Sequence, residues 1–115
     1  MNKFLVNKPW GNFLCYTKNE LTTVKILTIS PNQELSLQYH SHRSEFFRII
    51  KGNPTVIIGD KSIEAKANDE FDIPRGVQHQ IIANDNEVQV LEISFGDFDE
   101  EDIVRIKDKY GRIKK

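Results

Sequence analysis

Histidine and carboxylate side chains gather in two short stretches of this sequence. The first is LSLQYHSHRSE at residues 35–45, which holds His40, His42 and Glu45, and the second is IPRGVQH at residues 73–79, which ends in His79. Imidazole nitrogen and carboxylate oxygen together suit Zn, Fe, Mn, Co or Ni and do not select among them. The sequence therefore predicts one divalent metal ion, with His40, His42, Glu45 and His79 as candidate ligands.

Gln38 lies close to these residues in the sequence. Because side chains alternate along a strand, an extended segment would project Gln38, His40 and His42 from one face. A neutral amide oxygen can ligate a divalent cation, although it is a weaker ligand than imidazole. Gln38 and His42 are therefore both chemically able to bind the ion.

Short strands must position these residues. Apolar and polar residues alternate from Thr23 to Ile29, which is typical of a strand. Turn signals such as Ser30-Pro31-Asn32 and Pro74-Arg75-Gly76 separate further β-rich runs. Those runs cover residues 34–39, 45–51, 55–58, 62–65, 70–73, 79–83 and 87–95. Short strands at nearly even spacing predict an all-β sandwich or barrel.

The C-terminal segment has a different pattern. From Asp99 the sequence DEEDIVRIKDKYG places acids first and basic residues later, with Asp99 and Asp102 spaced like an N-cap and its N3 partner. This arrangement predicts a short helix that ends near Gly111.

Composition narrows the class of protein. The 115 residues, 38% of them hydrophobic, predict one domain over 1–115. A net charge of -1 gives no global field that would attract nucleic acid or an anionic membrane. Cys15 is the only cysteine, so an internal disulfide is excluded. Without an apolar run of spanning length or a signal-like start, we expect a cytoplasmic protein.

The two histidine-bearing stretches resemble the paired motifs of the cupin superfamily. Glu45 followed by six residues and Gly52 is similar to the end of the first motif, and Pro74, Gly76 and His79 match the second. Aligning Gln38 and His40 with the motif's His-x-His gives better spacing than aligning His40 and His42, and it places Asn32 where the motif has a glycine. The resemblance implies a double-stranded β-helix, or jelly-roll, barrel. It also implies that His40, Glu45 and His79 are metal ligands, while Gln38 and His42 compete for the fourth place.

A closer resemblance extends over nearly the whole chain. The segment 8–11, KPWG, the two histidine-bearing stretches and the tail EEDIVRIKDKYGR at 100–112 resemble the isomerase domain of type II phosphomannose isomerases. That domain is usually fused behind a mannose-1-phosphate guanylyltransferase. Because the matching pieces belong to the isomerase part, they give no reason to expect guanylyl transfer.

The resemblance implies a metal-dependent interconversion of mannose 6-phosphate and fructose 6-phosphate, most often in a homodimer. It implies phosphate binding by arginines, because a guanidinium grips two phosphate oxygens at once. Arg43, next to the predicted ligands, is the first candidate and is also a candidate catalytic residue. Arg105, Tyr110 and Arg112 of the tail motif are the next candidates for substrate binding. His42 is the candidate general base if it is not a ligand.

Two departures from the family pattern bear on activity. Phe46 stands where the family has histidine, and Gln80 stands in a substrate-binding position where it has arginine. A loss of positive charge at Gln80 would suit a sugar-phosphate binding module without catalysis. That module and another cupin enzyme, such as an epimerase or an iron dioxygenase, are the alternatives to the isomerase. Trp10 and Phe47 are expected in the core, and Tyr110 could pack the tail against the barrel.

Overall fold

The computed structural model describes residues 2–113, and this part of the chain is built from strands and loops. The strands are β1 (Phe4–Lys8), β2 (Gly11–Cys15), β3 (Thr22–Ile29), β4 (Leu37–Tyr39), β5 (Ser44–Lys51), β6 (Thr55–Ile58), β7 (Lys61–Glu64), β8 (Glu70–Ile73), β9 (His79–Ile82), β10 (Val88–Phe95) and β11 (Val104–Lys107).

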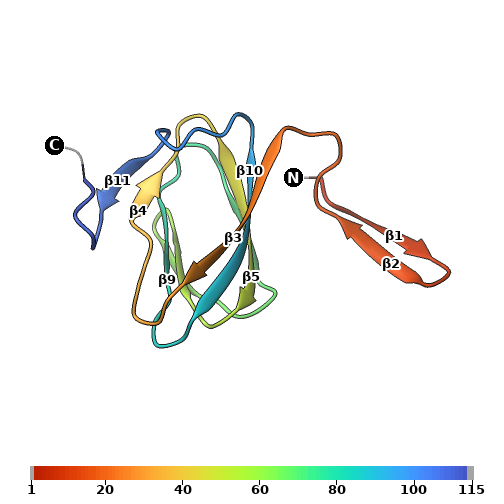
Figure 1. Cartoon of the computed structure of the whole chain (residues 1–115), viewed down its shortest axis with the longest axis horizontal. Coiled ribbons are helices and arrows are strands. Elements are labelled where there is room, and N and C mark those ends of the chain that lie inside the picture. The colour runs from red at the N-terminus through yellow and green to blue at the C-terminus, as the bar shows by residue number, and fades with distance from the viewer. Residues whose placement is uncertain (1, 114–115) are drawn as a thin grey trace.

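Two antiparallel sheets form the body of the molecule (Figure 1). The four-stranded sheet has the order β3-β10-β5-β8, and the five-stranded sheet has the order β11-β4-β9-β6-β7. A separate hairpin of β1 and β2 extends away from this body, on the right of Figure 1. The predicted all-β barrel is confirmed.

The inward-facing side chains of the strands are polar at one end of the barrel and apolar at the other. On β5 the inward residues run from Glu45 to Phe47 and Ile49, and on β9 they run from His79 to Ile81. Ile49 and Ile81 are fully buried and belong to the apolar core. Because inward positions repeat every second residue, each strand places a polar group at one end and apolar side chains at the other. The barrel therefore has an apolar end that supplies stability and a polar end that can hold a ligand.

The predicted strands agree well with the structure, with two exceptions before Thr55. The run 34–39 is a strand only at Leu37–Tyr39, while Glu34 forms an isolated bridge to Ile82. The hairpin of β1 and β2 was not predicted. Its tip carries Trp10, which is 73% exposed, so the expectation that Trp10 lies in the core is wrong. Phe47 is buried as expected.

The predicted C-terminal helix is also wrong. Asp99 and Asp102 do form one turn, in which the Asp102 N–H donates to the Asp99 carbonyl over 3.0 Å. The chain then extends as β11, because Ile103, Val104 and Ile106 are β-branched and β4 offers a free edge for pairing. Within residues 2–113 we find no helix with the length and apolarity needed to cross a membrane.

Candidate metal centre

Three buried side chains meet at the polar end of the barrel. His40 follows β4, Glu45 lies at the start of β5, and His79 begins β9. Glu45 Oε1 is 3.0 Å from His40 Nε2 and 3.3 Å from His79 Nε2. One ligand atom from each residue lies within 4.8 Å of the other two, so the cluster could hold a metal ion. The structure thus brings together the three ligands that the sequence predicted.

Hydrogen bonds on the far side of each imidazole orient the ligand atoms. His40 Nδ1 lies 2.7 Å from the Asp102 carbonyl, and His79 Nδ1 lies 3.0 Å from the Val77 carbonyl. A carbonyl can only accept, so both Nδ1 atoms carry a proton, and the Nε2 atom of each ring is the one that points toward Glu45 and could bind a metal. Three acceptor atoms that face one another repel unless a proton or a cation lies between them. This donor set therefore fits a divalent metal, with carbonyl partners of the kind that orient metal-binding histidines.

The second oxygen of Glu45 is also held in place. Ser94 on β10 donates to Oε2 over 3.0 Å. Burial alone would raise the pKa of Glu45, but hydrogen bonds with His40 and His79 outweigh it and hold this pKa well below its usual range. Glu45 is therefore a fixed negative charge at neutral pH, as a metal ligand must be.

A second carboxyl group, Glu92 on β10, lies beside Glu45. Burial raises the pKa of Glu92 to about 7, and the neighbouring Glu45 charge and a hydrogen bond with Glu45 add to the effect. Sequence reasoning missed this residue because it belongs to no motif. Its signal was a charged residue at an inward position of a strand whose other inward residues include Val88 and Val90.

Arg43 lies beside the ligands, as predicted, but its guanidinium is engaged with the protein. Nη2 is 3.4 Å from His40 Nε2, Nε is 3.5 Å from Glu45 Oε2, and Nη1 donates to the Asp99 carbonyl over 3.0 Å. Its guanidinium carbon also lies 4.5 Å from the centre of the Phe98 ring. Arg43 is 6% exposed, so these contacts make it a buried positive charge that positions the ligands and the loop at Asp99.

Gln38 and His42 have different surroundings. Gln38 pairs in register with His79 and lines the cavity that contains the cluster. His42 is exposed and lies outside both the cluster and the cavity lining. The expected face shared by Gln38, His40 and His42 does not form, because β4 ends at Tyr39 and the chain bends before β5.

Asp102 fixes this bend. Its carboxylate accepts hydrogen bonds from the backbone N–H groups of Ser41 (2.9 Å) and His42 (3.0 Å). Burial works to raise the pKa of Asp102, but these two bonds outweigh it and lower that pKa. Asp102 therefore orients the His40 ring through its carbonyl. Its carboxylate fixes the turn that directs His42 outward.

Replacing Asp102 by alanine is expected to weaken metal binding roughly 10–100-fold, the usual effect of losing an outer-shell partner. The two backbone N–H groups of the bend would lose their acceptor, which costs on the order of 1–2 kcal/mol of unfolding free energy. Titration with Co²⁺ and urea unfolding measure the two effects. Asp97→Ala, which removes an exposed acid on the same loop, should leave both unchanged.

A cavity of about 290 Å³ opens onto the cluster, close to the lower size limit of small-molecule sites. Basic side chains of Lys25, Arg43, Arg105 and Arg112 line it together with Gln38, His40, Glu45, His79 and Glu92. Among the described residues, Arg105 Nε and Ser36 Oγ are buried there without a hydrogen-bond partner. Arg112 is partly neutralised, since its guanidinium forms a fork with Asp108 at 2.8 and 3.0 Å. The cavity thus offers positive charge and unpaired polar groups next to the predicted metal.

Two predicted substrate-binding residues, Gln80 and Tyr110, lie outside this cavity. Gln80 lies on the opposite face of β9 from His79, where its amide donates to Glu34 Oε2 (2.8 Å) and the Leu35 carbonyl (3.0 Å). The glutamine therefore removes no charge from the cavity, contrary to expectation. The Tyr110 hydroxyl donates to Gln33 (2.8 Å) and accepts from the Glu34 N–H (3.2 Å), so it packs the tail against the barrel.

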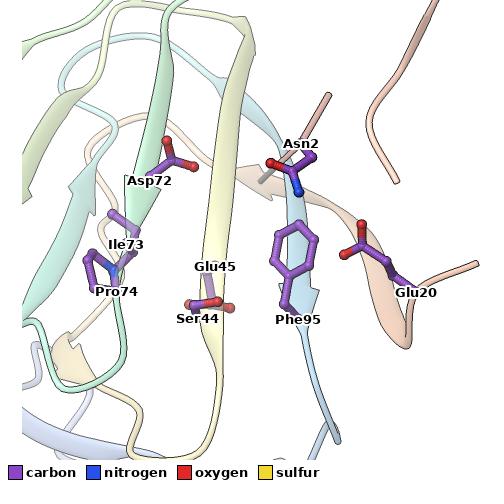
Figure 2. A pocket seen from close by; sticks show the side chains of 8 residues that line it. All are labelled: Asn2, Glu20, Ser44, Glu45, Asp72, Ile73, Pro74 and Phe95. Carbon is purple, nitrogen blue, oxygen red and sulfur yellow. The ribbon is translucent and has the colours of Figure 1, made fainter. Parts of the chain in front are cut away.

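A larger cavity of about 510 Å³ lies outside the four-stranded sheet (Figure 2). Ser44, Asp72 and Phe95 line it from the sheet, and Asn2 and Glu20 line it from the two ends of the hairpin segment. Glu45 borders this cavity as well, but its carboxylate is directed to His40 and His79 inside the barrel. The larger cavity therefore contains none of the imidazoles and is separate from the metal centre.

Comparison with known proteins identifies the same family that the sequence motifs indicated. The sequence model of the family described as "Mannose-6-phosphate isomerase C-terminal" matches residues 2–108. A similar curated protein is mannose-1-phosphate guanylyltransferase 2 of Escherichia coli O157:H7, 35% identical over 108 residues that make up 91% of this chain and 22% of that protein. The chain thus spans under a quarter of the length of this relative.

Solved structures support the fold. Oxalate decarboxylase from Bacillus subtilis matches with a TM-score of 0.69 and 22% identity, over 76% of this chain and 24% of that one. A cupin protein from Bacteroides fragilis matches with a TM-score of 0.59 and 22% identity, over 68% and 70% of the two chains. At this level of identity the likeness shows the cupin fold alone.

Proposed function

We propose that this chain, which belongs to the mannose-6-phosphate isomerase C-terminal family, is a metal-dependent sugar-phosphate isomerase. The proposed reaction is the interconversion of mannose 6-phosphate and fructose 6-phosphate. One observation carries the proposal: the His40, Glu45 and His79 cluster opens onto a cavity that also presents Arg105 and Lys25. A metal-dependent aldose-ketose isomerase places a cation near the sugar oxygens and needs positive charge for the phosphate.

His40, Glu45 and His79 would hold the metal, and Gln38 is the proposed fourth ligand because it lines the same cavity beside His79. When bound, a divalent metal at this place would polarise a sugar carbonyl and stabilise the negative charge of an enediolate. Glu45 supplies the single carboxylate of this set, so the site keeps a net positive charge with a divalent ion.

Arg105 is the proposed phosphate ligand. Its Nε is buried at the cavity without a partner among residues 2–113, and an unpaired guanidinium N–H is costly unless a ligand accepts from it. A phosphate oxygen is a suitable acceptor, since it forms charge-assisted hydrogen bonds with arginine. Arg112 and Lys25 add positive charge to the same cavity.

Glu92 is the proposed proton carrier, in place of His42. Glu92 lines the cavity, whereas His42 is exposed outside it. The reaction moves one proton between C1 and C2 of the sugar and another between O1 and O2, and a single carboxyl group can take the proton from one carbon and return it to the other. Lys25 and Arg43 provide positive charge near the carboxylate form of Glu92.

Gln80 and Phe46, the two residues that favoured a non-catalytic binding module, both lie outside the cavity. Gln80 faces away from the cavity, as described above. Phe46 lies on the outer face of β5, where its ring packs against Tyr16 with the two centres 5.5 Å apart. Neither departure from the family pattern therefore alters a residue that lines the cavity.

Metal removal tests the proposal directly. Protein stripped with a chelator is expected to show no conversion of mannose 6-phosphate, and Zn²⁺, Co²⁺, Mn²⁺ or Ni²⁺, added in turn, is expected to restore it. A coupled assay of fructose 6-phosphate formation measures the rate. Folded, metal-loaded protein that binds mannose 6-phosphate without converting it would refute the isomerase and leave a binding module.

A further inference from the structure

Ser36 is a buried polar residue of the cavity that the proposed function does not use. It comes just before β4, is 2% exposed, and lines the cavity together with Gln38, His40 and Arg105. Within the described part of the chain, its Oγ atom has no hydrogen-bond partner. A buried hydroxyl group without a partner costs free energy, because it has lost its bonds to water and gained none. Ser36 therefore has a hydroxyl group free to bind a ligand in the cavity.

A β-bulge allows Ser36 to face the cavity. By register, residues 34–38 lie opposite residues 79–82 of β9, so this segment has one residue more than the strand beside it. Leu35 and Ser36 are consecutive, yet both line the cavity, and Leu35 also packs against the apolar core. Strict alternation along a strand would send one of the two to the outer face, whereas a bulge directs both inward. The extra residue therefore lies at Leu35 and Ser36.

Gln80 holds this bulge from the outer side of the barrel. A bulge takes backbone groups out of the regular ladder, and a buried carbonyl then needs another donor. The Leu35 carbonyl accepts from the Gln80 amide over 3.0 Å, and the same nitrogen donates to Glu34 Oε2 over 2.8 Å. Gln80 is 8% exposed, so these bonds are shielded from water. Gln80 thus fixes the two residues before Ser36 without entering the cavity.

Ser36 and Arg105 are neighbours in the five-stranded sheet. Arg105 on β11 pairs with Gln38 on β4, and Ser36 is two residues before Gln38, so Ser36 and Arg105 are diagonal neighbours. The Cα atoms of such residues are about 7–8 Å apart, a distance that a long side chain can span. Arg105 Nε and Ser36 Oγ are both buried without a partner among the described residues. A ligand group with several acceptor oxygens would satisfy the two atoms together.

The position of this pair fits the phosphate of a sugar phosphate. Ser36 is two residues from Gln38, the proposed fourth metal ligand, and a strand advances about 3.3 Å per residue, so Ser36 lies about 7 Å from Gln38 along the strand. In the proposed reaction C1 and C2 of the sugar lie at the metal, and the phosphate is on C6, at the other end of the hexose. A sugar phosphate in this orientation brings its phosphate toward Ser36 and Arg105.

We propose that Ser36 and Arg105 together form the phosphate subsite, and that Gln80 is the positioning residue that keeps Ser36 in it. This inference rests on the proposed function for the class of ligand, a sugar phosphate. The Ser36 hydroxyl donates to one phosphate oxygen while Arg105 donates through Nε. Gln80 touches no part of the substrate and acts through the Leu35 carbonyl.

Replacing Ser36 by alanine tests the subsite. The dissociation constant and the KM for mannose 6-phosphate should both rise roughly 10-fold, the usual weight of one hydrogen bond to a charged group, while kcat and metal content change little. Calorimetric titration with mannose 6-phosphate and, separately, with inorganic phosphate measures affinity whether or not the sugar is converted. Ser62→Ala, which removes an exposed hydroxyl on β7, is the matched control and should bind both like wild type.

Stability without ligand distinguishes binding from a structural role. The Ser36 hydroxyl has no partner in the free protein, so Ser36→Ala should resist urea at least as well as wild type. Saturating mannose 6-phosphate should then stabilise Ser36→Ala less than it stabilises wild type. A Ser36→Ala protein that is less stable without ligand and binds phosphate normally would show that the hydroxyl serves the fold alone.

Three variants test the role of Gln80. Gln80→Met keeps the size of the side chain but cannot donate, so it should raise KM toward the value of Ser36→Ala with little change in kcat. Gln80→Arg, which can donate to both acceptors, should bind like wild type. Gln89→Met on the outer face of β10 changes a half-buried glutamine and should have no effect.

The double variant Ser36→Ala with Gln80→Met decides whether Gln80 acts through Ser36. It should bind mannose 6-phosphate no more weakly than Ser36→Ala alone, since the hydroxyl that Gln80 positions is already gone. Losses that add, or a Gln80→Arg protein that binds weakly, would overturn the positioning role. Unchanged affinity in Ser36→Ala, or wild-type protein that binds neither mannose 6-phosphate nor inorganic phosphate, would overturn the subsite. Wild-type protein that binds the sugar phosphate without converting it would refute the isomerase and leave the subsite standing.

Discussion

Replacing Glu45 by glutamine is expected to abolish metal binding and, with it, isomerase activity. Glu45 Oε1 faces both His40 Nε2 and His79 Nε2, and its charge is the part of the cluster that a neutral amide cannot replace. Affinity should fall at least about 100-fold, beyond the range typical of outer-shell partners. Elemental analysis after gel filtration measures the metal, and the coupled assay measures the conversion.

The Glu45→Gln experiment has a matched control. Glu64→Gln removes an exposed carboxylate on β7 and should leave metal content and activity unchanged. His79→Ala should behave like Glu45→Gln, since it removes another ligand from a different strand. A folded Glu45→Gln protein that retains one metal per chain would exclude the cluster as the metal centre.

Replacing Glu92 by glutamine is expected to have the second-largest effect. If Glu92 moves the proton, its loss should lower kcat by roughly 10²–10⁴-fold, while metal content and the affinity for mannose 6-phosphate change little. Steady-state kinetics at saturating metal separates kcat from KM. His42→Ala provides the comparison, because His42 is exposed outside the cavity and its variant should retain near wild-type activity. The opposite pattern, with His42→Ala inactive and Glu92→Gln active, would return the role of base to His42.

Stability gives an independent readout for Glu92 in metal-free protein. Its pKa in the folded state is raised from 4.5 to about 7, so between these values the unfolded chain binds fewer protons than the folded one. The favourable contribution is complete below about pH 4.5, declines as the pH rises, and is lost above about pH 7. Glu92→Gln should therefore be more stable than wild type at pH 8, by on the order of 3 kcal/mol, and similar to it at about pH 4. Urea unfolding at both pH values measures the difference.

Local pattern was sufficient to predict most strands and the three ligands. The alternation of Val24 to Ile29 and the turn residues around Pro74 and Gly76 depend on neighbouring side chains and backbone preferences, so they can be recognised along the chain. Asn32 stands where the family motif has a glycine, and its φ of 63° is the left-handed conformation that a glycine favours. His40, Glu45 and His79 were predictable because their residue types suit a metal and their spacing matches the cupin motifs.

Side-chain direction across a bend was not predictable from the local pattern. His42 was expected beside His40, but the carboxylate of Asp102, which is distant in sequence, binds the backbone of the bend and turns His42 outward. In the same way, the tail formed β11 instead of a helix because β4 offered an unpaired edge. Both outcomes depend on groups far apart along the chain, whose positions exist only after the sheets assemble.

The sequence by itself determined the all-β class, most of the strands and the His40, Glu45 and His79 ligand set, because these follow from period-two alternation, turn chemistry, ligand type and the match to the cupin motifs. Only the tertiary structure decided that Glu92 lies beside the cluster and that Gln80 faces away from it. Those features arise from register between distant strands, and a shift of one residue would have reversed each of them.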